Sequence, residues 1–97
     1  MYTLQETPEF SKWLKRLKDR KGASIIASRL VGMQSGMFGD VKYFDGLGEM
    51  RVHFGPGYRV YFIERGTQVV VLLCAGSKGT QDKDIVRAKK LAAQLQG

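Results

Sequence analysis

The sequence predicts an α+β domain, in which a twisted antiparallel β-sheet packs against an N-terminal helical hairpin and a C-terminal helix. Residues 48–78 have the pattern of three consecutive antiparallel strands, with apolar and polar side chains alternating from Met50 to Phe62. The segments before and after them carry apolar residues at helical spacing. Ninety-seven residues with 43% apolar composition suit a single domain, residues 1–97, with its own core.

Two helices are predicted after a short first strand at residues 2–6. Thr7 and Pro8 indicate a helix start, because threonine caps a first turn and proline fits the first helical position. The apolar face of this helix is expected to be Phe10, Trp13, Leu14 and Leu17. Residues 20–22 interrupt the pattern, and a second helix is expected over residues 23–36. Its inward side is expected to be Ile26, Leu30 and Met33.

The central hairpin is predicted to turn at residues 55–57, Gly-Pro-Gly, after a strand at residues 41–44 and a turn from Asp45. A three-residue turn pairs Phe54 with Tyr58, His53 with Arg59, Val52 with Val60 and Arg51 with Tyr61. One face of the hairpin is then apolar and is expected to lie against the helices: Met50, Val52, Phe54, Tyr58, Val60 and Phe62. The other face carries Arg51, His53, Arg59 and Tyr61.

The third strand is expected to extend this second face. A two-residue turn around Gly66 would place Leu72, Cys74 and Lys78 on the side of Arg59. A three-residue turn or a β-bulge would instead reverse the direction of Lys78. After Gly79 the last helix is expected to begin at a Thr80 cap. Its buried side is expected to be Ile85, Ala88, Ala92 and Leu95.

The net charge of +7 predicts an anionic partner, either a nucleic acid or an acidic protein segment. The cations concentrate in the first and last helices, where they form either a solvated outer face or a phosphate-binding surface. The single Cys74 is interpreted as a small buried hydrophobic residue, which fits a reducing cytoplasm. The sequence has neither a membrane-length apolar run nor a signal peptide, so a cytoplasmic protein without membrane contact is predicted.

The candidate chemistry lies on the polar face of the hairpin. His53 is expected to lie between Arg51 and Arg59, whose charges would favour a neutral, proton-accepting imidazole, or else only to pack at an edge of the sheet. Arg59 can clamp a phosphate through two hydrogen bonds, or it can pair with Glu49. Tyr61 can stack on a base or simply pack. One histidine and one cysteine give no metal-ligand set, and neither a metal nor another cofactor is expected.

Three segments resemble the RelE/ParE superfamily of bacterial toxins, and most closely its HigB-like "addiction module killer protein" branch. They are FSKWLKRLKDRKG, GMFGDVKYFDGLGEMRVHFGPGYRVYF and LLCAGSKGTQDKDI. The resemblance implies a toxin of a type II toxin–antitoxin system. Its partners would be an adjacently encoded antitoxin, expected to be a helix-turn-helix protein, mRNA on the ribosome, and operator DNA reached through the antitoxin complex.

The resemblance also implies a metal-independent, ribosome-dependent endoribonuclease, an mRNA interferase. His53 would accept the 2′-hydroxyl proton, Arg59 and Lys78 would stabilise the phosphorane, and Arg51 and Tyr61 would position the RNA. Where several nuclease members carry aromatic or histidine residues near the C-terminus, this chain has Asp82 and Asp84. A ParE-like inhibitor of DNA gyrase, acting by protein binding without catalysis, is therefore an open alternative.

Overall fold

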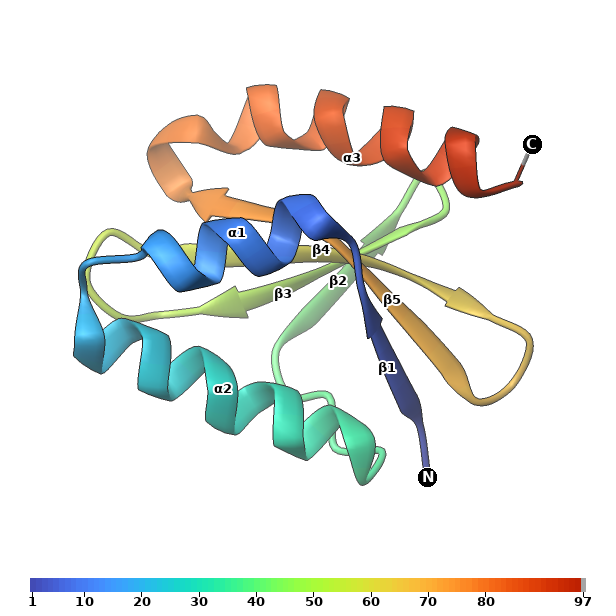
Figure 1. The fold of residues 1–97 in the computed structure, drawn as a ribbon, viewed down its shortest axis with the longest axis horizontal. Helices are drawn as coiled ribbons and strands as arrows, with labels where there is room; N and C mark the ends of the chain where they lie inside the picture. The colour runs from blue at the N-terminus through green and yellow to red at the C-terminus, as the bar shows by residue number, and fades with distance from the viewer. Residues whose placement is uncertain (97) are drawn as a thin grey trace.

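The computed structural model describes residues 1–96 and confirms the α+β architecture (Figure 1). Every predicted strand and helix is present in the predicted order. The elements are β1 (Thr3–Glu6), α1 (Pro8–Arg16), α2 (Arg20–Gln34), β2 (Val41–Phe44), β3 (Leu47–Val52), β4 (Tyr58–Arg65), β5 (Val69–Ser77), a 3-10 turn η1 (Lys78–Thr80) and α3 (Gln81–Gln96).

The five strands form one mixed sheet in the order β1-β5-β4-β3-β2. The three pairings from β2 to β5 are antiparallel, but β1 lies parallel to β5 at the edge. The prediction of a purely antiparallel sheet was therefore wrong at this edge. None of the helices within residues 1–96 is both long and apolar enough to cross a membrane.

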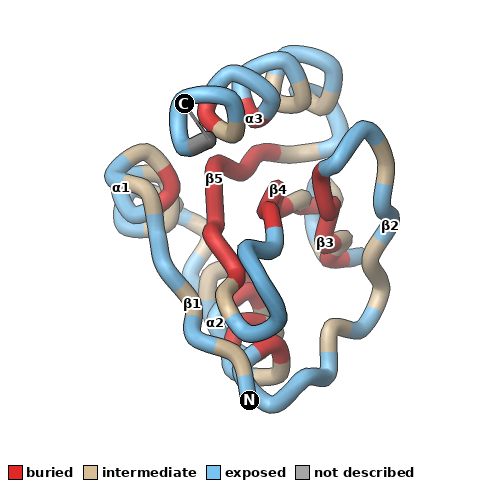
Figure 2. Tube along the Cα trace, turned by 90° about the vertical axis from the view of Figure 1, so that its right-hand side faces the viewer, coloured by how far each residue is buried: buried red, intermediate tan, exposed pale blue. Residues whose placement is uncertain are grey.

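The sheet is covered on both faces (Figure 2). One face packs against α1 and α2 around Phe10, Ile26 and Phe62. The opposite face packs against α3 around Tyr61, Leu73 and Ala88. The expectation that all helices lie on one apolar face was therefore wrong for α3. The long central strands β4 and β5 explain the difference, because most of their residues are buried, on both faces of the sheet.

The central hairpin differs from its prediction in register but not in the assignment of faces. Arg51 lies opposite Arg59, and Val52 lies opposite Tyr58. The connection is therefore a loop of residues 53–57, longer than the predicted turn, and the predicted pairs were wrong by two positions. A shift of two residues leaves every strand side chain on its predicted face. The hairpin before it closes tightly at Asp45 and Gly46, whose φ angles of 52° and 78° suit a two-residue turn.

Two irregularities in the β4–β5 hairpin decide to which face of the sheet the side chains of β5 point. The β4–β5 turn contains residues 66–68 rather than two residues, and a β-bulge follows where the register shifts between Tyr61 and Phe62. Each irregularity moves the side chains that follow it to the opposite face of the sheet. Residues beyond both irregularities therefore return to their predicted face. Cys74 consequently lies opposite Tyr61 on the predicted side, whereas Leu72 packs in the α1–α2 core and its predicted placement was wrong.

Helix α2 begins earlier than predicted. It starts at Arg20, because the Asp19 carboxylate accepts a hydrogen bond from the Gly22 amide at 2.9 Å and caps the first turn. Asp19 also accepts a hydrogen bond from the Tyr58 hydroxyl at 2.6 Å, which ties the start of α2 to β4. Gly22 is required here, since a Cβ atom would lie 2.7 Å from the Tyr58 ring.

Candidate active site at the open end of the sheet

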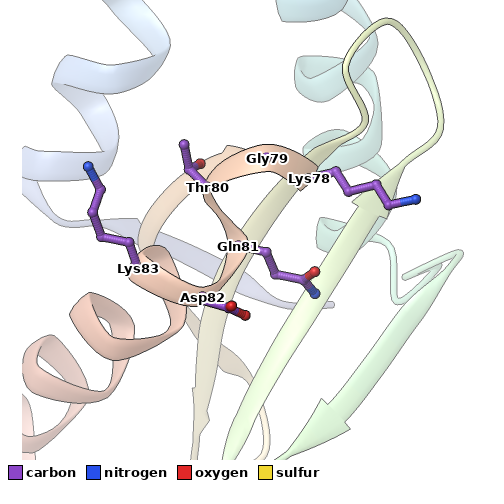
Figure 3. A pocket seen from close by; sticks show the side chains of 6 residues that line it. All are labelled: Lys78, Gly79, Thr80, Gln81, Asp82 and Lys83. Atoms are coloured by element: carbon purple, nitrogen blue, oxygen red, sulfur yellow. The ribbon is translucent and has the colours of Figure 1, made fainter.

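Four of the five predicted site residues lie at one end of the sheet, beyond the cover of α3. Arg51 ends β3, His53 lies in the following loop, Arg59 begins β4, and Lys78 follows β5. The Gly57 carbonyl joins Lys78 to Arg59, because it accepts hydrogen bonds from the Lys78 amide at 2.8 Å and from an Arg59 guanidinium nitrogen at 3.1 Å. Figure 3 shows the Lys78 side chain extending towards this loop, while Lys83 points the opposite way.

Arg51 and Arg59 are direct cross-strand partners. Like charges in opposed positions destabilise a sheet. Each guanidinium is offset by its own carboxylate, Asp40 for Arg51 and Glu49 for Arg59. In both arginines the Nε atom is buried without a hydrogen-bond partner. Two guanidinium groups held by carboxylates in opposed positions place two fixed positive charges at this end of the sheet.

Asp40 organises one side of the site. Its carboxylate accepts a hydrogen bond from an Arg51 terminal nitrogen at 2.8 Å, and its other oxygen pairs with His53 Nε2. These contacts, with His53 first and Arg51 second, lower the pKa of the Asp40 carboxyl below its ordinary value. The His53 side chain is 71% exposed, so its other ring nitrogen is open to a ligand.

Arg29 of α2 holds the segment that carries Asp40. It donates hydrogen bonds to the carbonyls of Arg51 at 2.7 Å, Phe38 at 3.1 Å and Asp40 at 3.4 Å. Gly39 lets the guanidinium approach, because its φ is 69° and a Cβ atom would lie 2.8 Å from an Arg29 nitrogen. Sequence reasoning identified neither Arg29 nor Asp40 as a site residue, since no spacing rule predicts that Arg29 of α2 or Asp40 before β2 contacts the β3–β4 hairpin.

Glu49 organises the other side. Its side chain is almost fully buried, and one carboxylate oxygen accepts hydrogen bonds from the Tyr61 hydroxyl at 2.9 Å and the Gln81 amide at 2.8 Å. Arg59 Nε lies 3.7 Å from the same oxygen. The Arg59–Glu49 pairing considered from the sequence is thus present. It leaves the Arg59 side chain 12% exposed at the mouth of the site.

Tyr61 lies apart from the other four residues. It is fully buried beneath α3, and burial, followed by its contact with Glu49, raises the pKa of its hydroxyl well above the ordinary value. In this structure the ring cannot reach a bound RNA. Its role is to support Glu49 and, through it, Arg59.

A shallow pocket of 490 Å³ adjoins the site at the start of α3. Its lining is Lys78, Gly79, Thr80, Gln81, Asp82 and Lys83 (Figure 3). Across residues 1–96, no group of three histidine, cysteine or acidic side chains lies close enough to hold a metal ion. Cys74 is buried, which raises the pKa of its thiol to about 12 and makes it a poor nucleophile.

Replacing Asp40 with asparagine is expected to weaken the acid dependence of stability. A carboxyl whose pKa is lowered in the folded state contributes stability above its unfolded pKa of about 3.9, and the contribution disappears as the pH falls through the folded value. Wild type should therefore melt at a higher temperature than Asp40→Asn near neutral pH, and this difference should shrink as the pH falls. Melting curves across the acid range test this, with Asp45→Asn, at an exposed ion pair with Lys89, as the control. Parallel acid profiles for wild type and Asp40→Asn would contradict the assignment.

Comparison with known proteins places the chain in a family. No family model matches it. An uncharacterized protein of Haemophilus influenzae is 44% identical over 93 residues, which cover 95% of this chain and 94% of the relative. Identity at this level over nearly the full length of both proteins indicates common descent. The chain belongs to the same family as this Haemophilus influenzae protein.

Proposed function

We propose that the chain is a toxin of a type II toxin–antitoxin system, of the HigB-like branch of the RelE/ParE superfamily, and that it cleaves mRNA on the ribosome without a metal ion. The observation that carries the proposal is the exposed His53–Asp40 pair beside the opposed Arg51 and Arg59. A proton acceptor held by a carboxylate next to fixed cations suits the cleavage of a phosphodiester. The cytoplasm is the proposed location.

The reaction begins with a ribose 2′-hydroxyl. His53 Nε2 faces Asp40, so in the neutral imidazole the proton on Nε2 is donated to the carboxylate and Nδ1 carries the lone pair. Nδ1 accepts the 2′-hydroxyl proton as the 2′-oxygen attacks the adjacent phosphorus. The bond from phosphorus to the 5′-oxygen breaks, and that oxygen takes a proton from the His53 imidazolium or from water. The products are a 2′,3′-cyclic phosphate and a 5′-hydroxyl.

The cations stabilise the pentavalent phosphorane. Lys78 is exposed and, among residues 1–96, has no carboxylate partner, so its ammonium is available to a phosphate oxygen. Arg59 is held beside it through the shared Gly57 carbonyl. Arg51, with its side chain 34% exposed, positions the RNA while anchoring Asp40. Preorganised charge of this kind commonly supplies much of the rate enhancement of an enzyme.

The proposed partner is an antitoxin encoded beside the toxin, which would carry a helix-turn-helix and bring the toxin to operator DNA. The net charge of +7 supports rapid association with an acidic or amphipathic segment. Expression of the chain alone should then arrest growth, and co-expression of the neighbouring gene should restore it.

Replacing His53 with glutamine is expected to lower the cleavage rate by roughly 10²-fold, because the cations remain while the proton acceptor is lost. The measurement is cleavage of end-labelled mRNA on programmed ribosomes by purified protein. An mRNA with a 2′-deoxynucleotide at the cleaved position should resist wild type, because it lacks the nucleophile. Cleavage of the deoxy substrate, or an unchanged rate for His53→Gln, would contradict the proposed chemistry.

A further inference from the structure

A group of cations that the proposed active site does not use lies where α1 meets α2, the junction at the left of Figure 1. Five cations crowd this corner, which we call the basic elbow: Lys15, Arg16, Lys18, Arg20 and Lys21. Within residues 1–96, none of them forms an ion pair with a carboxylate. The acidic residue in the elbow, Asp19, is committed to the Tyr58 hydroxyl and the Gly22 amide.

Helix stability does not explain these cations. Lys15 and Arg16 lie in the last turn of α1, where the helix dipole favours positive charge. Arg20 and Lys21, however, lie in the first turn of α2, where the dipole favours negative charge, and that turn contains no acidic residue. Cations placed against the dipole without a partner cost stability, which indicates a role in binding.

The elbow is anchored to the sheet and contains a pocket. Tyr58 ties it to β4 through Asp19 at 2.6 Å, and the Trp13 ring packs edge-on against Tyr58. A pocket of 470 Å³ lies between four of the cations, with Leu14, Leu17 and Ala23 completing its lining. Fixed cations around an apolar floor suit the binding of a polyanion such as RNA. The cations attract its phosphates, and the apolar floor contacts its sugars.

The elbow is also continuous with the proposed active site. Lys21 Nζ lies 5.7 Å from the centre of the Phe54 ring, in the loop that carries His53. A Cβ atom on Gly55 of the same loop would lie 3.5 Å from the Asp19 carboxylate. The elbow therefore adjoins the β3–β4 loop, which carries His53 and whose Gly57 carbonyl accepts a hydrogen bond from the Lys78 amide.

We propose that the basic elbow is a second RNA-binding surface, which grips the phosphate backbone of a structured RNA segment beside the strand held at His53. This inference rests on the proposed function and extends it. RNA is favoured over an acidic protein because the elbow contacts the loop that carries His53, at the proposed site for phosphodiester chemistry. Backbone contacts of this kind add affinity without sequence preference.

The test compares two triple variants of the full chain with the same change in charge. The elbow variant carries Lys15→Gln, Lys18→Gln and Lys21→Gln. The control carries the same change at three exposed lysines on β2 and on the second half of α3: Lys42, Lys89 and Lys90. The probe is a fluorescein-labelled 2′-O-methyl RNA hairpin, which cannot be cleaved through its 2′-oxygen, so binding is measured independently of catalysis.

The elbow variant is expected to bind the hairpin roughly tenfold or more weakly than the control variant at about 0.1 M salt. The slope of log affinity against log salt should decrease by about 2 to 3, one phosphate contact for each lysine lost. Circular dichroism melting should show that both variants remain folded.

Equal binding by the two variants would overturn the inference. So would an elbow variant that retains the hairpin but loses binding to polyglutamate, because the elbow would then be a surface for an acidic protein. Failure of the proposed function is distinguishable. In that case wild type would cleave no mRNA, whereas the difference in hairpin binding between the two variants would persist.

Discussion

Val60→Asp is expected to unfold the domain. Val60 is fully buried in the middle of β4, between Met50 on β3 and Ala75 on β5, and it faces the core shared with α1 and α2. A carboxylate placed there without a partner costs several kcal/mol, against a total stability of roughly 5 to 15 kcal/mol. Far-UV circular dichroism and the fluorescence of Trp13, the single tryptophan, measure the unfolding.

Val86→Asp is the matched control. The same substitution lies on α3 at a side chain that is 56% exposed, where changes usually alter stability by about 0.5 kcal/mol or less. Its melting temperature should stay close to that of wild type. If Val60→Asp melted like Val86→Asp, the assignment of faces in the central hairpin would be wrong.

Loss of the Arg59 charge is expected to have the largest effect on activity, roughly 10³-fold. The obvious variant, Arg59→Ala, also removes the cation beside the almost fully buried Glu49, and an uncompensated buried charge destabilises the fold. We therefore expect the clearest result from Arg59→Ala combined with Glu49→Gln. A glutamine oxygen can still accept the hydrogen bonds from Tyr61 and Gln81.

The comparison is between the double variant and Glu49→Gln alone, in the ribosome cleavage assay. Both proteins should melt cooperatively and bind the same antitoxin, because only a minority of the side chains in a protein interface contribute strongly to its affinity. A folded double variant that cleaves mRNA as fast as Glu49→Gln would remove Arg59 from the proposed mechanism.

The order of elements and the faces of the central hairpin could be predicted because they depend on local periodicity. Alternation from Met50 to Phe62 assigned each strand residue to a face, and a register error of two positions did not change that assignment. The length of the β3–β4 loop could not be predicted, since Gly-Pro-Gly fits several connections. Cys74 lies on its predicted side only because a longer turn and a β-bulge cancelled.

Of the two carboxylates of the site, Glu49 was considered from the sequence as a partner of Arg59, whereas Asp40 was not identified. Asp40 reaches Arg51 and His53 from a loop that Arg29 holds in place, and no spacing rule connects those segments. The place of α3 depends on β4 and β5 being apolar on both faces, which makes the second face of the sheet a core as well. Because this second core was not predicted, Tyr61 was assigned to an open surface, although it is fully buried beneath α3.

The most direct test of the central claim is to map the 5′ ends of mRNA in cells arrested by the chain. Wild type should create new 5′-hydroxyl ends within reading frames, and these should vanish when translation is blocked or when the Arg59→Ala and Glu49→Gln double variant replaces it. The supercoiling activity of gyrase, measured in the presence of the wild-type protein, should be unaffected. Growth arrest without new mRNA ends, together with inhibited supercoiling, would contradict the account and support a ParE-like gyrase inhibitor.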